Sequence, residues 1–245
     1  MTTTTSDQKI AFIPLEANPP LLTSLLHKLG VSPALAIHDV YSLDDPSLLA
    51  FVPRPALALL LVFPVSETYE AHRLAEDADK PDYAGSGEGE GVVWFRQTIR
   101  NACGLMGLLH AVSNGPARNF IEPNSTLSTL LDQAIPLPPK ERSVLLETSQ
   151  ALSAAHRETA EQGATSAPEA ADDVDLHYVC FVKTDDGRLW ELDGRRKGPL
   201  ARLEGMSEEE DVLSERALKA GPLEFLGRER GDLRFSCVAL AGALD

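Results

Sequence analysis

The sequence predicts a layered domain of the α/β type, in which helices pack against a central sheet. Segments with the periodicity of amphipathic helices alternate with short apolar segments that are typical of strands. One of these, residues 56–65 (ALALLLVFPV), is apolar on both faces and too short to span a bilayer, which indicates a central buried strand. A turn of sequence Asp-Asp-Gly at residues 185–187 separates two further strand-like segments and predicts a hairpin.

The elements before the central strand carry clear start and stop signals. Asn18 can cap a helix that begins at Pro19, since Asn is a good N-cap and Pro suits the first helical position. Leucines follow at helical spacing, and Gly30 ends the helix. The other elements expected here are a short strand at residues 10–14, a strand at 36–41 and a short helix that begins at Asp45, after a frayed polar terminus at 1–8.

An acidic segment separates the helices that we expect in the middle of the chain. Residues 76–91 (EDADKPDYAGSGEGEG) contain too little apolar surface to offset the entropy cost of ordering, so we expect a mobile loop that acts as a solvated linker. The helices expected around it are residues 66–75, 102–113, 125–134 and 138–147, and residues 92–95 form an apolar extended segment.

The last third of the chain combines the hairpin with a polar connection that precedes it. Residues 150–175 begin with a helical pattern but become rich in Ala, Glu, Thr and Ser, which is typical of a functional or disordered loop. The elements expected after it are the hairpin strands at 176–184 and 188–193, a strand at 199–203, a helix at 207–220 that begins with a Ser-x-x-Glu capping pattern, and a closing strand at 234–240.

The net charge restricts the classes of partner. The chain has 22 basic and 37 acidic residues, a formal net charge of −15, and no run of Lys or Arg. Binding to nucleic acid or to an anionic membrane needs a concentrated basic patch, so neither is expected. A basic protein or peptide partner is compatible with this charge.

Cysteine usage and the first residues indicate a reducing compartment. Three widely spaced cysteines can form neither a closed set of disulfides nor a pair of metal ligands, so no metal or other cofactor is expected. Cys180 and Cys237 lie in apolar strand patterns and are expected in the core. The start of the chain, MTTTTSDQK, is polar and unlike a signal peptide. We therefore expect a protein of the cytoplasm or nucleus.

The segment from Gln97 to His110 (QTIRNACGLMGLLH) is the most informative part of the sequence. It places Cys103 in the first turn of an amphipathic helix, just after Asn101, which can cap that helix. The positive end of the helix dipole favours a thiolate there, and the free backbone N–H groups can bind an oxyanion. Gln97, six residues before the thiol, could supply a further N–H. Taken alone, however, a free cysteine is more often simply buried.

His177 and Asp193 occupy corresponding places in the predicted hairpin. They are 16 positions apart across its tight turn, so both side chains are expected at the same end of adjacent strands. A histidine titrates near neutrality and suits a base for a thiol, and an aspartate can hold its second ring nitrogen. Each residue also has an ordinary interpretation, as a surface histidine and as a turn residue after a strand.

The order of these residues along the chain, Gln97, Cys103, His177 and then Asp193, is that of papain-like thiol enzymes. Several separate motifs also strongly resemble, in the same order, the ubiquitin C-terminal hydrolase family of cysteine deubiquitinases. The resemblance runs from about residue 10 to residue 244 and is to the small single-domain members. The motifs are residues 14–19 (PLEANP), 51–55 (FVPRP), 97–110, 175–177 (DLH), 191–195 (ELDGR) and 233–235 (LRF).

This resemblance implies a papain-like α+β fold with a central antiparallel sheet between helices, as a single knotted domain over residues 1–245. It implies that Cys103 attacks the carbonyl after the terminal glycine of ubiquitin and that Gln97 helps to hold the oxyanion. His177 would be the base, oriented by Asp193. The implied enzyme is a monomeric deubiquitinase that hydrolyses ester, thioester, amide or peptide bonds, releases small adducts and processes ubiquitin precursors.

The resemblance further implies a crossover loop at about residues 148–174, which would admit only narrow or unfolded leaving groups, and a ubiquitin-binding face. Two alternatives remain open. The first is a non-catalytic ubiquitin-binding or scaffold protein of the same fold, and the second is a general papain-like peptidase, which the lack of a secretory signal disfavours. The residues expected on the ubiquitin-binding face are Pro14, Leu15, Glu16, Asp39, Val40 and Leu176.

Overall fold

The structure, a computed structural model, describes residues 10–163, 175–228 and 234–244. Within these residues six strands form one sheet in the order β1-β6-β2-β3-β4-β5, and every neighbouring pair is antiparallel. The antiparallel sheet that the family resemblance implied is therefore confirmed. The strands are β1 (Leu35–Asp39), β2 (Ala58–Pro64), β3 (Leu176–Lys183), β4 (Leu189–Leu192), β5 (Leu200–Leu203) and β6 (Ser236–Gly242).

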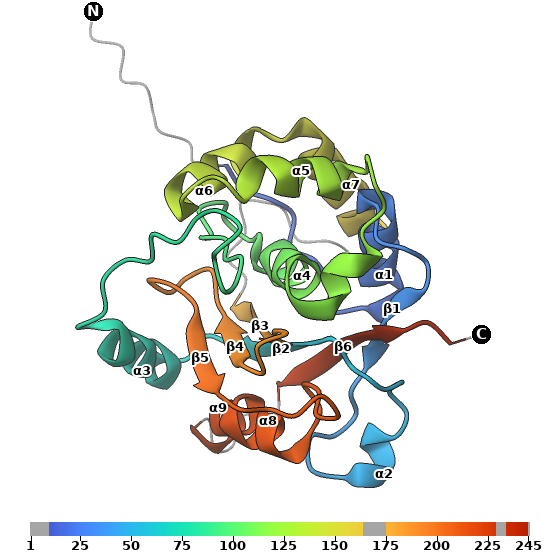
Figure 1. The fold of residues 1–245 in the computed structure, drawn as a ribbon, viewed down its shortest axis with the longest axis vertical. Helices are drawn as coiled ribbons and strands as arrows, with labels where there is room; N and C mark the ends of the chain where they lie inside the picture. The colour runs from blue at the N-terminus through green and yellow to red at the C-terminus, as the bar shows by residue number, and fades with distance from the viewer. Residues whose placement is uncertain (1–9, 164–174, 229–233, 245) are drawn as a thin grey trace, which may run out of the picture.

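Helices cover both faces of this sheet (Figure 1). One core cluster joins the sheet to α1, α4, α5, α6 and α7, and the other joins its opposite face to α3, α8 and α9. The helices are α1 (Pro19–Leu29), α2 (Pro46–Leu49), α3 (Glu67–Asp77), α4 (Cys103–Ser113), a 3₁₀ helix (Gly115–Phe120), α5 (Thr126–Ala134), α6 (Pro139–Thr148), α7 (Gln150–Ala160), α8 (Glu215–Ala220) and α9 (Pro222–Arg228).

Strand β2 is central and buried along its whole length, as its two-sided apolar pattern predicted. Successive side chains of a strand point to opposite faces of the sheet. Leu60 accordingly packs in the cluster that contains α4, whereas Leu59 and Leu61 pack in the cluster that contains α8. The strand pairs with β3 on one side and with β6 on the other, so it links the hairpin to the end of the chain.

Two glycines allow α4 to lie close to the sheet and to the N-terminal segment. A Cβ atom at Gly107 would approach Leu60 Cδ2 to 2.8 Å, and a Cβ atom at Gly104 would approach Leu15 Cβ to 3.1 Å. Real Cβ atoms do not make the first contact and rarely make the second, so the close packing of this helix depends on the missing side chains. It places the N-terminus of α4 beside residues 14–17.

Two of the predicted elements do not form over their expected lengths. Residues 10–14 contain only an isolated bridge between Ala11 and Arg100 rather than a strand. The helix expected over 207–220 begins only at Glu215. Asp211 explains the delay, because its carboxylate is bound by the Arg54 guanidinium and the Ala56 backbone N–H, which hold this part of the chain against the sheet.

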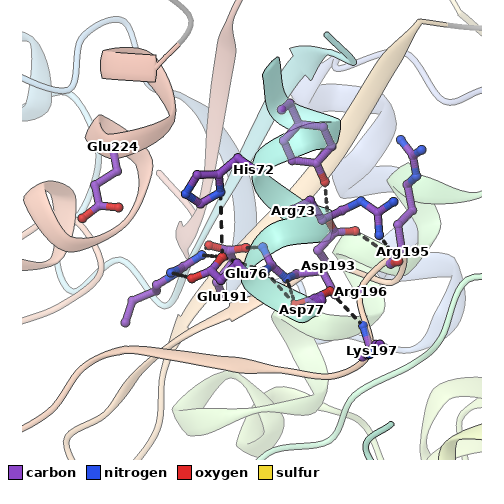
Figure 2. Close-up of polar contacts among 12 residues, drawn as sticks. His72, Arg73, Glu76, Asp77, Glu191, Asp193, Arg195, Arg196, Lys197 and Glu224 are labelled. Atoms are coloured by element: carbon purple, nitrogen blue, oxygen red, sulfur yellow. Dashed lines mark hydrogen bonds and ion pairs between the residues drawn. The ribbon is translucent and has the colours of Figure 1, made fainter. Parts of the chain in front are cut away.

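The acidic segment of residues 76–91 is irregular but is not a solvated linker, so that expectation was wrong. Its first two residues complete α3, and the Asp77 carboxylate is buried against Arg196 (Figure 2). Near its end, Glu90 and Arg142 form an ion pair in which both side chains are almost fully buried. Acidic residues thus anchor the segment by pairing with arginines far away in the sequence.

The polar connection before the hairpin begins with a packed helix. Helix α7 buries Leu152, His156, Thr159 and Ala160 and contacts α1, so the predicted crossover loop does not start at residue 148. The rest of that predicted loop, residues 164–174, lies outside the described residues. The predicted knot likewise stays a prediction. None of the helices in the described ranges is long and apolar enough to cross a membrane.

Candidate active site

Cys103 is the first residue of α4, as its sequence context predicted. The N-cap position belongs to Ala102, so the expected Asn101 cap was wrong. Asn101 lies one residue earlier in the left-handed conformation, with φ 58°, and turns the chain into the helix. The thiol is partly exposed, and its Sγ lies 3.9 Å from the carbonyl oxygen of Leu176 at the start of β3.

His177 and Asp193 meet at the same end of the hairpin, which confirms their predicted proximity. His177 is the second residue of β3, and Asp193 directly follows β4. The Nε2 atom of His177 lies 2.8 Å from Oδ1 of Asp193, and both side chains are buried. The remaining ring nitrogen, Nδ1, is thereby left for the thiol.

The Asp193 carboxylate accepts hydrogen bonds at both of its oxygens. The backbone N–H of Arg195 donates to Oδ1 over 2.8 Å, and the Tyr69 hydroxyl donates to Oδ2 over 2.5 Å. Trp94 Nε1 donates to the Asp193 carbonyl oxygen over 3.1 Å. Burial raises the pKa of the Asp193 carboxyl, but His177 and these donors outweigh burial and hold that pKa below its usual range. The carboxylate therefore stays ionised beside the imidazole.

The electrostatics of His177 favour a protonated ring. Burial alone lowers the pKa of this histidine, whereas the Asp193 carboxylate and a hydrogen bond with the Cys103 side chain raise it. The net effect raises the pKa of His177 to about 9. An imidazole of this kind is a strong base toward a neighbouring thiol, and the resulting imidazolium is stabilised by Asp193.

Gln97 is held beside the turn that carries Asp193. Its backbone N–H donates to the Gly194 carbonyl oxygen over 2.9 Å, and its Nε2 donates to the Ile99 carbonyl oxygen over 3.3 Å. A Cβ atom at Gly194 would lie 2.9 Å from Gln97 Cβ and 3.1 Å from the Phe95 carbonyl oxygen, so only glycine permits this approach. Gln97 Oε1 is buried and has no hydrogen-bond partner in the described part of the chain.

A pocket of about 250 Å³ opens beside Cys103. Pro14, Leu15, Glu16 and Leu176, four of the six residues expected to contact ubiquitin, line it together with Cys103. The pocket thus brings the N-terminal segment, the helix start and the first residue of β3 to one place. Further lining residues are Ala17, Val62, Asn101, Ala160, Gly163, Tyr178, Arg234 and Ser236.

The other two residues expected on the ubiquitin-binding face lie outside this pocket. Asp39 is exposed at the end of β1 and pairs with Val238 of β6. Val40 follows it, but its side chain is buried in the core cluster on the face of the sheet opposite to α4. Asp39 can therefore present its carboxylate to a partner, whereas the Val40 side chain is enclosed by the fold.

Residues that the sequence left without a role hold the segments around the site in place. His110 Nε2 accepts a hydrogen bond from the Phe95 N–H over 3.0 Å, and Asn114 bonds both backbone groups of Val93. Burial lowers the pKa of His110 to about 4, so this histidine is neutral. His156 Nε2 lies 2.7 Å from the carbonyl oxygen of Ile13, just before the pocket residues 14–17.

The arrangement can perform acyl transfer. A sulfur nucleophile at a helix N-terminus, an imidazole base and a buried carboxylate that orients the base are the parts that such chemistry requires. Within residues 10–163, 175–228 and 234–244, no group of three or more His, Cys, Asp or Glu side chains could hold a metal ion.

Comparison with protein families shows a match over most of the chain. A family model described as ubiquitin carboxyl-terminal hydrolase, family 1, matches residues 12–220. The ubiquitin carboxyl-terminal hydrolase of Drosophila melanogaster is 36% identical over 234 residues, which are 96% of this chain and 99% of that protein. The isozyme L1 of Rattus norvegicus is 36% identical over 230 residues, covering 94% and 98% of the two chains. The Saccharomyces cerevisiae hydrolase YUH1 is 37% identical over 200 residues, covering 80% of each.

A solved structure has the same fold. The Trichinella spiralis UCH37 catalytic domain, bound to ubiquitin vinyl methyl ester, matches with a TM-score of 0.73 at 21% sequence identity. The match covers 95% of this chain and 96% of that one. The predicted fold class is therefore confirmed.

Proposed function

This chain belongs to ubiquitin carboxyl-terminal hydrolase family 1, a family of thiol-dependent deubiquitinating enzymes, and we propose that it hydrolyses bonds to the C-terminal glycine of ubiquitin, with Cys103 as its nucleophile. The observation that supports this proposal most directly is the meeting of three side chains, one of which, Cys103, lines a pocket. Cys103 lines the pocket, and His177 contacts both Cys103 and Asp193. The bonds cleaved would be esters, thioesters, amides or peptides.

In the proposed reaction, Nδ1 of His177 takes the thiol proton and the Cys103 sulfur attacks the glycine carbonyl carbon. The Cys103 backbone N–H, at the start of α4, and the Gln97 side chain hold the negative oxygen of the tetrahedral intermediate. The leaving group departs with a proton from His177, and a water molecule then hydrolyses the thioester. Asp193 stabilises the imidazolium throughout and itself stays ionised.

For substrate recognition, we propose that the ubiquitin tail enters through the pocket beside Cys103. Leu15 and Leu176 supply apolar contact there, and the Glu16 carboxylate suits a basic tail. Asp39, exposed on β1, would extend the acidic surface toward the body of ubiquitin. The enzyme is proposed to act as a monomer in the cytoplasm or nucleus, consistent with the three free cysteines.

The proposal is tested with a fluorogenic amide of the ubiquitin C-terminus, with the matching amides of ubiquitin-like modifiers as controls. We expect turnover of the ubiquitin amide and a lower kcat/KM for each modifier. Saturable binding of ubiquitin without any turnover would instead identify a non-catalytic ubiquitin-binding protein of the same fold.

We further propose that small adducts are preferred over bulky ones. Ala160 at the end of α7 and Gly163 just beyond it line the pocket, so the chain after α7 passes close to the thiol. We expect ubiquitin joined to a small amine, and short ubiquitin precursors, to be cleaved much faster than ubiquitin chains linked through a folded second ubiquitin. Equal kcat/KM values for small adducts and linked chains would contradict this preference.

Replacement of Gln97 by alanine should lower kcat by roughly 10²- to 10³-fold, the usual cost of losing one oxyanion donor. The side chain now bonds the Ile99 carbonyl oxygen over 3.3 Å, a long bond that leaves the amide able to turn toward a developing charge. Steady-state kinetics with the fluorogenic amide separate kcat from KM. A rise in KM with unchanged kcat would show that Gln97 binds substrate and does not stabilise the oxyanion.

A further inference from the structure

Helix α3 lies along the turn of residues 193–197, which carries Asp193 (Figure 2). The Arg73 guanidinium donates to the Arg195 carbonyl oxygen over 3.0 Å. One turn further, the Asp77 carboxylate accepts a hydrogen bond from the Lys197 backbone N–H over 3.3 Å. This helix therefore holds the turn at two backbone groups, the Arg195 carbonyl oxygen and the Lys197 N–H.

Tyr69 extends this set of contacts to Asp193 itself. It lies in the first turn of α3, where Ser66 caps the helix by accepting from the Tyr69 backbone N–H over 2.9 Å. Its ring is buried between aromatic side chains, with its centroid 4.8 Å from that of Phe63 and 6.2 Å from that of Phe225. Its hydroxyl therefore has a fixed position, 2.5 Å from Asp193 Oδ2.

The two oxygens of Asp193 have different partners. Oδ1 accepts from His177 and from the Arg195 backbone, whereas Oδ2 accepts from Tyr69. A buried carboxylate oxygen that loses its donor carries a large desolvation cost, and its group rotates or attracts a proton to reduce that cost. Either response would change the hydrogen bond that Oδ1 accepts from the His177 imidazole.

We propose that Tyr69 is a positioning residue for the reaction, because its hydroxyl fixes the orientation of the Asp193 carboxylate that holds His177. Helix α3 is then the element that aligns this carboxylate, since it carries Tyr69 and binds the turn at Arg195. The inference rests on the proposed function of Cys103, His177 and Asp193, and it adds a residue from a different element.

The test compares Tyr69→Phe with Tyr83→Phe. Both changes remove only a hydroxyl, and the Tyr83 hydroxyl bonds the Val92 carbonyl oxygen over 3.4 Å and the Glu90 carboxylate, not that of Asp193. For Tyr69→Phe we expect kcat to fall about tenfold with KM unchanged, as for the loss of one charge-assisted hydrogen bond. Tyr83→Phe should keep the wild-type kcat. A Tyr69→Phe enzyme with wild-type kcat would overturn the proposal.

A double-mutant cycle separates positioning from a general structural effect. In the Asp193→Asn background the carboxylate is already absent, so adding Tyr69→Phe should change kcat by less than about twofold. If it lowers kcat as much as in the wild-type background, Tyr69 acts through something other than Asp193 and the proposal fails. Turnover by the wild type and its loss in Cys103→Ala report on the proposed function separately.

A second measurement needs no turnover. In inactive Cys103→Ala protein, the proton on His177 Nε2 faces Asp193 and should give a downfield NMR resonance. We expect this resonance to shift or broaden when Tyr69→Phe is added and to stay in place with Tyr83→Phe. An unchanged resonance with Tyr69→Phe would also overturn the proposal.

Discussion

Replacement of Cys103 by alanine is expected to abolish hydrolysis while ubiquitin binding is retained. The loss of kcat should be on the order of 10⁶-fold, the size found when a nucleophile that acts with its base is removed. The fold should persist, because the thiol is partly exposed and the close contacts of α4 with the sheet come from Gly104 and Gly107. Steady-state kinetics measure the first effect, and calorimetry with ubiquitin measures the second.

Cys237→Ala is the matched control for this variant. It also removes one thiol, but Cys237 lies in β6 among core residues on the face of the sheet opposite to α4. We expect it to lower the stability somewhat while leaving kcat/KM close to that of the wild type. Undiminished hydrolysis by Cys103→Ala would remove the central claim about the nucleophile.

Replacement of His177 by alanine should cost about as much as replacement of Cys103. The base and the nucleophile act as one unit, so losing either removes the same reaction path and the two losses do not add. The double variant Cys103→Ala/His177→Ala should therefore be no slower than either single one. Its residual rate, measured with the fluorogenic amide at high enzyme concentration, checks this directly.

His38→Ala serves as the control for the loss of an imidazole. The His38 ring bonds the Gly242 carbonyl oxygen over 2.8 Å at the edge of the sheet. None of the bonds described for this ring involves Cys103 or Asp193. Its kcat should equal that of the wild type. A double variant at Cys103 and His177 much slower than either single one would mean that the two residues act independently.

Capping and turn residues in the sequence correctly predicted helix α1 and the β3–β4 hairpin. Asn18 caps α1 and Gly30 ends it in the left-handed conformation, with φ 102°, as expected from the two residues alone. The hairpin forms because Gly187, with φ 75°, can occupy its turn, and the pairing of β3 with β4 follows. Since His177 near the start of β3 and Asp193 just after β4 lie at the same end of this hairpin, their meeting could also be predicted.

Contacts between distant parts of the chain could not be predicted in the same way. Tyr69 and Asp193 are separated by 124 residues, and Arg54 and Asp211 by 157, so no spacing along the sequence relates them. The helix expected at residues 207–220 was misplaced for this reason. Its capping bond does form, from the Ser207 N–H to Glu210 over 2.8 Å, but the pairing of Asp211 with Arg54 prevents the helix from continuing there.

Composition was also a poor guide to the acidic segment. Its charge and its glycines suggested a solvated loop, because isolated charges are costly to bury. The Arg142 guanidinium changes this balance, since it pairs with Glu90 and also bonds the carbonyl oxygens of Ala134 and Ile135. A buried charge whose hydrogen bonds are all satisfied can stay in the interior, and its partner arginine is recognisable only in the folded chain.

The unequal burial of the three cysteines has a consequence for covalent modification. Cys180 is fully buried, and burial raises the pKa of Cys237 to about 12, so neither offers a thiolate to a reagent in solution. Cys103 alone is partly exposed. Toward alkylating agents, the folded protein should therefore behave as a monothiol. Unfolding exposes the other two thiols. The number of thiols alkylated per molecule therefore measures the fraction of the protein that is unfolded.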